Sequence, residues 1–129
     1  MEFVVLVDEC RASRILARAV FEELGCTVYE AGSVEEANAH VASKPVSLVV
    51  AAPRVGQTDY LKELRVSSHR PEIPFVFMAL PEDVGTIRKL DDKIHDGYIL
   101  RPVTKLRALD KLTELFPARA SEPTRQRTG

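Results

Sequence analysis

Charged residues stand at the ends of two apolar segments, where a parallel sheet would bring them together. Asp8 and Glu9 follow the apolar run at residues 3–7, and Arg101 follows the run at residues 97–100. Ligands of open parallel sheets bind beyond the carboxyl ends of the strands, so these charges would share one crevice. Paired carboxylates can bind a metal ion, and a guanidinium can bind a phosphate or a carboxylate.

The third and fourth apolar runs bring only methyl groups to the same crevice. The run at residues 47–52 ends at Ala52, and the run at 75–79 ends at Ala79. Neither side chain can act as a nucleophile, bind a metal or donate a hydrogen bond. The crevice would therefore hold charges without a group that can be modified covalently. No histidine or serine is placed to work with the two acids, so we do not expect an enzyme.

Alternation of apolar strands with amphipathic segments predicts the fold class. Five strands are expected at residues 3–7, 26–30, 47–52, 75–79 and 97–100. The segments between them carry helical patterns, which implies parallel βαβ units and helices on both faces of the sheet. The expected architecture is a three-layer, doubly wound (βα)5 α/β fold of the flavodoxin-like type.

Apolar spacing and capping residues predict where the helices begin and which side faces inward. Ser33 and Glu36 form a capping-box pattern, Gly25 ends the first helix, and Thr104 caps the last one. A helix after Ala52 rests only on Leu61 and Leu64, with Asp59 near its N-terminus. The inward-facing residues expected on the other helices are Ile15, Leu16, Ala19, Val20 and Leu24; Val34, Ala37 and Val41; Val84, Ile87, Leu90 and Ile94; and Leu106, Leu109, Leu112 and Phe116.

Composition narrows the class of protein. The chain has 129 residues, 45% of them hydrophobic, which favours one globular domain over residues 1–117. Residues 118–129 contain no large apolar residue and are expected to be a disordered tail or linker. A net charge of −1 gives no field for nucleic acid or membrane. Two cysteines form no disulfide framework, which favours the cytoplasm, and three scattered histidines show no metal-ligand spacing.

The order of these elements resembles a response-regulator receiver domain over residues 3–116. The features that carry the resemblance are Val4-Val5-Leu6-Val7-Asp8-Glu9, the helix ending at Gly25, and Gly97-Tyr98-Ile99-Leu100-Arg101-Pro102. The resemblance implies strand order 2-1-3-4-5 and a cis Arg101–Pro102 bond. It also implies roles by position: a Mg²⁺-binding acidic pair at Asp8 and Glu9, the phosphate acceptor at Ala52, a hydroxyl at Ala79, a lysine at Arg101, and the switching aromatic at Tyr98.

Three of these positions depart from the family pattern. Ala52 removes the phosphate acceptor and one oxygen ligand, so we expect no resident cofactor and at most weak metal binding by Asp8 and Glu9. Ala79 removes a donor to phosphate, and Arg101 replaces a lysine with a planar fork. We therefore expect a degenerate pocket closed on itself, in which Arg101 pairs with Asp8 or Glu9. Packing against a helix is the favoured reading of Tyr98.

The resulting hypothesis is a pseudo-receiver, an interaction module in bacterial signal transduction that works without phosphorylation. Its partner would be a kinase, regulator or effector. Association of the chain with a second copy as a homodimer is a further option. The expected interaction surface comprises Tyr98, Arg88, Lys89, Lys93, Arg107 and Lys111. The alternative is a small-molecule sensor whose vacated pocket binds a ligand. The hypothesis that Asp59 is a substitute phosphate acceptor is weaker than the interpretation that Asp59 is a residue at a helix N-terminus.

Overall fold

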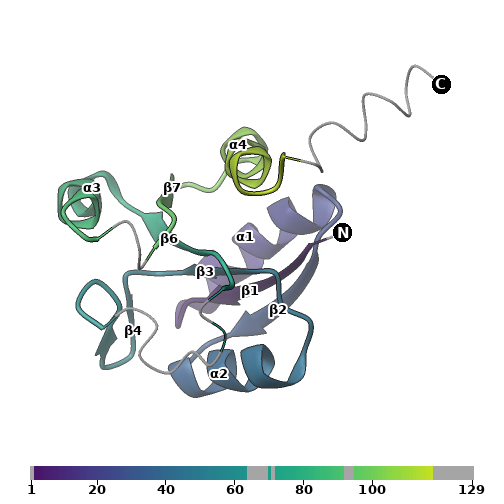
Figure 1. The fold of residues 1–129 in the computed structure, drawn as a ribbon, viewed down its shortest axis with the longest axis horizontal. Coiled ribbons are helices and arrows are strands. Elements are labelled where there is room, and N and C mark those ends of the chain that lie inside the picture. Colours follow the sequence, from purple (N-terminus) through teal and green to yellow (C-terminus); the bar gives the residue numbers. More distant parts are fainter. Residues whose placement is uncertain (1, 64–69, 71, 92–94, 118–129) are drawn as a thin grey trace.

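A computed structural model of the chain describes residues 2–63, 70, 72–91 and 95–117. Five parallel strands form the central sheet in the order β2-β1-β3-β6-β7 (Figure 1). Their bounds are β1 Phe3–Val7, β2 Thr27–Ala31, β3 Leu48–Ala51, β6 Phe75–Ala79 and β7 Tyr98–Leu100. The predicted strand order and fold class are confirmed, with strand ends that differ from the expected ones by one residue.

Four helices in the described part of the chain cover the two faces of this sheet, namely α1 Arg11–Glu23, α2 Val34–Ser43, α3 Pro81–Arg88 and α4 Lys105–Leu115. Side chains alternate along the strands, so Val4 and Leu6 face one core while Val5 and Val7 face the other. The first core contains buried residues of α1 and α4, and the second contains those of α2 and α3. Strands buried on both faces explain why the central segments are wholly apolar.

The helix ends carry the predicted capping groups. Ser33 Oγ accepts from the backbone N of Glu36 at 3.1 Å, and Thr104 Oγ1 accepts from that of Arg107 at 3.2 Å. The Glu36 carboxylate accepts from the backbone N of Gly32, one residue before the position that a capping box uses. Gly25 follows α1 with φ of 89°, a left-handed conformation that glycine adopts without steric cost.

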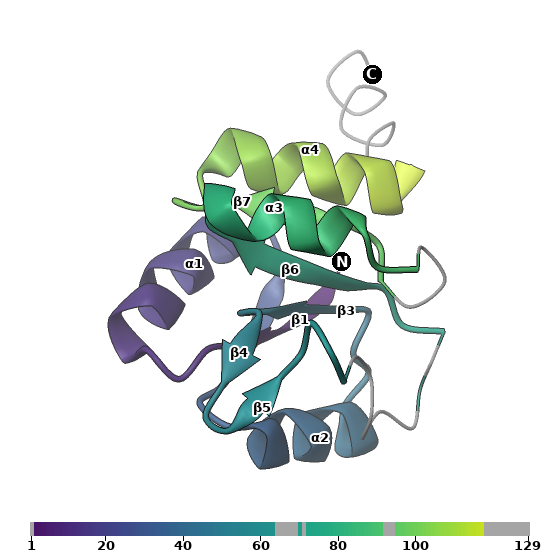
Figure 2. The same cartoon turned by 90° about the vertical axis from the view of Figure 1, so that its left-hand side faces the viewer.

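The predicted helix after Ala52 is wrong for the described residues. Arg54–Val55 (β4) and Thr58–Asp59 (β5) form an antiparallel hairpin that lies near α2 in Figure 2, and turns follow up to residue 63. Asp59 is therefore a strand residue, and its carboxylate bonds Arg54 at 3.2 Å. Gly56 supplies the left-handed φ of 59° that the hairpin turn uses. Leu64 lies outside the described residues.

The helix with the expected inward-facing residues Val84, Ile87, Leu90 and Ile94 is shorter than predicted. It ends at Arg88, and Leu90 follows in a turn in which its backbone N donates to Ile87 O. Ile87 is the buried anchor of α3, and Pro81 is the first residue of the helix. Ile94 lies outside the described residues.

The inward face of α1 is also displaced from the prediction. Ala17 and Phe21 are its buried residues, and Val20 and Leu24 pack against the same core as predicted. Ala19 is exposed, and Leu16 and Ile15 are 71% and 45% exposed. The large ring of Phe21 fills the core beneath the sheet and sets the rotation of the helix, which turns the Ile15–Leu16 side outward. A similar displacement occurs in α4, where Ala108 and Leu112 are buried and Leu106 and Leu109 are exposed.

Candidate functional site

Asp8 is held at the carboxyl end of β1 by several bonds. Its backbone N donates to Ala31 O at 3.0 Å, and its carboxylate Oδ1 accepts from the backbone N of Cys10 at 2.9 Å. The residue is only 5% exposed, so its charge requires a partner. Glu9, the other predicted acid, is exposed and has no ion-pair partner among the described residues.

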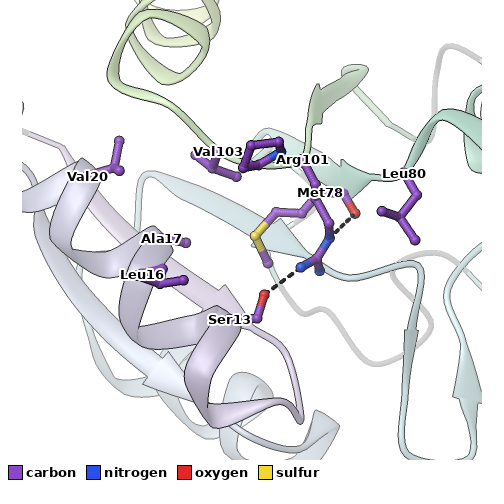
Figure 3. A pocket seen from close by; sticks show the side chains of 9 residues that line it. Ser13, Leu16, Ala17, Val20, Met78, Leu80, Arg101 and Val103 are labelled. Atoms are coloured by element: carbon purple, nitrogen blue, oxygen red, sulfur yellow. Dashed lines mark hydrogen bonds between the residues drawn. The ribbon is translucent and has the colours of Figure 1, made fainter.

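Arg101 is the partner of Asp8. Its Nη2 lies 3.0 Å from Asp8 Oδ2, while Nη1 donates to the hydroxyl of Ser13 and Nε donates to the carbonyl of Met78 at 3.4 Å. Figure 3 shows the guanidinium directed from β7 toward α1 and Ser13. The predicted pairing of Arg101 with an acid of the crevice is confirmed for Asp8. The Arg101–Pro102 bond is cis, as expected.

The two alanines lie where the strand ends require. Ala52 follows β3, its backbone N donates to Val7 O at 2.8 Å, and it is 6% exposed. Ala79 ends β6, is fully buried, and its carbonyl accepts from the backbone N of Arg101 at 2.8 Å. The parallel strands therefore bring Asp8, Ala52, Ala79 and Arg101 to the same edge of the sheet, while Glu9 is exposed.

Sequence reasoning missed Ser13 and Arg14, which fix the surroundings of Asp8. Arg14 Nη1 donates to the Asp8 carbonyl at 2.7 Å, and its Nε bonds Glu30 at 2.8 Å. Hydrogen bonds from Arg18 and Arg14 hold the pKa of Glu30 below its usual range. Ser13 and Arg14 both lie in the first turn of α1, which begins three residues after Asp8. That closeness in the sequence was the available signal.

No metal site appears in the part of the chain that is described, where no three histidine, cysteine or acidic side chains gather closely enough to bind an ion. Asp8 could serve as an oxygen ligand, but one of its oxygens is already bonded by Arg101. Mg²⁺ requires a nearly octahedral set of oxygens, and Ala52 offers no side-chain oxygen. The residues present therefore fit a resident Mg²⁺ poorly.

A groove of about 590 Å³ opens beside Arg101, between α1 and the segment that follows β7. Figure 3 shows its lining, which is mainly apolar: Ser13, Leu16, Ala17, Val20, Met78, Leu80, Arg101, Pro102 and Val103. Ala52 and Ala79 do not line it. The groove is therefore distinct from any space that the two alanines leave.

The predicted interaction surface lies over α3, β7 and α4, and its charges are partly engaged. Arg88 Nη2 donates to the Tyr98 hydroxyl at 3.2 Å, and Arg107 Nη1 donates to Pro102 O at 3.0 Å. Lys111 bonds Glu114 and its side chain is only 15% exposed. Tyr98 is partly buried and packs against the core that contains Ile87 of α3. Lys89 is exposed, and Lys93 lies outside the described residues.

No protein-family model matches the chain, and no curated protein matches its sequence. Solved structures do match it. The chemotaxis response regulator CheY4 of Vibrio cholerae is 17% identical with a TM-score of 0.71. The match covers 90% of this chain and 99% of that one. The response regulator receiver domain protein (CheY-like) of Methanospirillum hungatei JF-1 is 20% identical with a TM-score of 0.73, covering 95% and 98% of the two chains.

A third match is the signal receiver domain of an HD domain-containing protein from Pseudomonas fluorescens Pf-5, 21% identical with a TM-score of 0.76. It covers 96% of this chain and 93% of that one. The chain has the fold of a response-regulator receiver domain. At these identities the likeness concerns the receiver fold alone. Among the described residues, no helix combines the length and the apolar character needed to cross a membrane.

Proposed function

We propose that this chain is a pseudo-receiver, an interaction module of bacterial signal transduction whose state does not depend on phosphorylation. One observation carries the proposal: Ala52 stands at the end of β3, and Arg101 is bonded to Asp8 in the same crevice. A receiver works by covalent transfer to a carboxylate at the Ala52 position, and a methyl group cannot accept a phosphoryl group.

The bonded Arg101 replaces, in this proposal, what metal and phosphate do elsewhere in the receiver fold. An arginine–carboxylate bond is directional and strong where water is partly excluded, and Asp8 is almost fully buried. Bonds to Ser13 and Met78 fix the guanidinium further. The module would thus keep one conformation and present one surface to a protein partner such as a kinase, regulator or effector.

The partner surface is proposed over α3, β7 and α4, where Lys89 and Arg107 are exposed. Charged residues at such a surface provide specificity and faster association more than affinity. The double substitution Lys89→Glu and Arg107→Glu should weaken capture of the cognate signalling protein. Glu35→Lys on α2, which packs over β1 and β2 at the other end of the sheet, serves as the control. Unchanged binding by the first variant would move the partner site elsewhere.

The proposal is tested directly by incubation with Mg²⁺ and acetyl phosphate, followed by intact-mass measurement. The natural chain should gain no phosphoryl group, and neither should Asp59→Asn, since Asp59 is bonded to Arg54 in the hairpin. A mass gain that Asp59→Asn abolishes would identify Asp59 as an acceptor and contradict the proposal.

A second candidate function, sensing of a small molecule, is favoured by the apolar groove beside Arg101. Its volume of about 590 Å³ lies within the range of ligand sites. A ligand there would contact Arg101 and could alter its bond to Asp8. Thermal unfolding with a panel of nucleotides and quinones separates the two candidates, because only a sensor should show a raised Tm that Val103→Trp, which fills the groove, removes.

A further inference from the structure

The outward face of α1 carries an unusual pattern for a solvated helix surface. Ala12, Ile15, Leu16 and Ala19 are all exposed, and Leu16 is 71% exposed. The helix lies at the periphery of the molecule, on the left in Figure 2. Single exposed leucines need no explanation, but adjacent apolar residues on one helix face make a continuous patch.

The pattern is symmetric about the midpoint between Ile15 and Leu16. Two large residues stand at the centre, and a small alanine lies three residues away on each side. Ala12 and Ala19 are seven residues apart, or about two helical turns, and therefore share one face. If a second α1 packs in the opposite direction across a two-fold axis at this midpoint, Ala12 faces Ala19 of the copy, and the large side chains fill the space above the alanines.

Opposite charges flank this apolar centre. Arg11 opens the helix and Glu22 lies in its last turn, and both are exposed on the side of the face that Ile15 occupies. In the antiparallel pair, Arg11 comes within about two residues, or ~3 Å along the axis, of Glu22 of the copy. Arg11 has no ion-pair partner among the described residues. Glu22 bonds only Arg18 there, at 3.0 Å.

We infer that α1 is a self-recognition surface, on which a second copy of this chain binds in an antiparallel arrangement across a two-fold axis. A two-fold interface uses the same patch on both subunits, so its pattern must complement itself when reversed. The α1 face meets that condition in the sizes of its four apolar residues and in the Arg11–Glu22 pairing. A parallel pairing would place Arg11 against Arg11 and Glu22 against Glu22, which repel each other.

The size of the surface sets the strength of the association. A helix of 13 residues is about 20 Å long and covers less than the roughly 800 Å² per partner of a standard interface. The dimer is therefore weak, and its mass depends on concentration over about 10 µM to 1 mM. Sedimentation equilibrium of the full chain should show the average mass rising above the 14.4 kDa of the monomer in this range.

Charge reversal tests the pairing. Arg11→Glu sets two carboxylates against each other at each contact, and Glu22→Arg sets two guanidinium groups against each other there. Each variant alone should therefore associate at least about tenfold more weakly than the natural chain. An equimolar mixture of the two variants tests the pairing further, because only a mixed dimer has opposite charges at both contacts. The association of the mixture is therefore compared with that of each variant alone.

In that mixed dimer, one contact joins the two introduced side chains, a glutamate at position 11 and an arginine at position 22, which attract each other. The other contact joins the natural Arg11 of one subunit and the natural Glu22 of its partner, which also attract. The mixture should therefore recover the association of the natural chain. Recovery in the mixture is not expected from a variant that has merely unfolded.

Leu16→Asp and Leu106→Asp form the matched control pair. Both leucines are highly exposed, at 71% and 68%, but Leu106 lies on α4. Leu16→Asp should abolish association, and Leu106→Asp should leave it unchanged. A natural chain that stays monomeric at 1 mM would overturn the inference, as would dimers of both charge-reversed variants alone or loss of the dimer only in Leu106→Asp.

Discussion

Arg101 is the residue on which the closed crevice depends. Its guanidinium bonds the Asp8 carboxylate, the Ser13 hydroxyl and the Met78 carbonyl, and so joins β1, α1 and β6 at one point. The Asp8 side chain is 7% exposed, whereas that of Arg101 is 23% exposed. A buried charge that loses its partner keeps the full cost of desolvation.

Arg101→Met should therefore lower the free energy of unfolding by about 1–3 kcal/mol, less than for a completely buried pair because Arg101 is partly exposed to water. Arg101→Lys, which keeps the charge but not the planar fork, should lose less. Urea denaturation at neutral pH measures both. Equal stability of Arg101→Met and the natural chain would show that the bond contributes nothing.

Glu30 is the second charged residue whose surroundings affect stability. Arg18 and Arg14 both bond its carboxylate at 2.8 Å, and these bonds hold its pKa below the ordinary value of 4.5. A carboxyl with a lowered pKa in the folded state binds protons less readily than in the unfolded state. Its contribution is present above pH 4.5 and is lost as the pH falls through the lower folded pKa.

Glu30→Gln should thus lower stability at pH 7 by about 1 kcal/mol, a value reduced for the partial exposure of the pair to solvent. The difference from the natural chain should shrink as the pH is lowered below 4.5, because both proteins then lack the charge. Urea denaturation at a series of pH values measures this. A difference that stays constant down to about pH 2.5 would contradict the linkage.

The hairpin of β4 and β5 is the element that departs most from the expected fold. Tyr60 follows it and is only 7% exposed, its backbone N donates to Pro53 O at 2.7 Å, and its ring lies 5.7 Å from that of Phe75. Burial, with a smaller effect of Glu35, raises the pKa of Tyr60 to about 12. This residue anchors the loop after Ala52 to the core.

Tyr60→Ala should cost about 3 kcal/mol of stability through the cavity that it leaves, whereas Tyr60→Phe should cost less than about 1 kcal/mol. Thermal or urea unfolding of both variants measures the difference. If Tyr60→Ala proves as stable as Tyr60→Phe, the ring does not anchor the loop.

Physical signals of different strength explain which elements could be predicted. The strands are continuous apolar runs because both faces are buried, and that signal does not depend on register. The rotation of α1 depends on how Phe21 fits the core, which spacing alone does not reveal. The segment after Ala52 has few apolar anchors, and it forms a hairpin whose turn contains Gly56 with a positive φ.

Within the candidate site, the positions of Asp8, Ala52, Ala79 and Arg101 follow from the end of each strand and were predictable. The contacts of Arg101 with Ser13 and the Met78 carbonyl were not, because they depend on a side-chain conformation and on a backbone oxygen that carries no sequence signal. Glu9 was grouped with Asp8 by adjacency, but the backbone after β1 directs it to solvent.

For the molecule as a whole, the receiver fold determines which residues meet at one edge of the sheet. The five-stranded sheet still brings the carboxyl ends of β1, β3, β6 and β7 to one edge. That edge now holds an internal ion pair and two methyl groups. If the proposed pseudo-receiver function holds, the outward faces of the helices are the surfaces to examine for a protein partner.

Two-dimensional amide NMR of the natural chain with Mg²⁺ and beryllofluoride, a phosphoryl mimic, tests whether the crevice is closed to phosphate. Ala52→Asp, which introduces a carboxylate acceptor, is recorded beside it. The natural chain should show no shifts around Asp8, Glu9 and Arg101, because Arg101 occupies the carboxylate and Ala52 offers no ligand. Shifts at these residues in the natural chain would mean that its crevice still binds a metal or an anion, and would contradict the account.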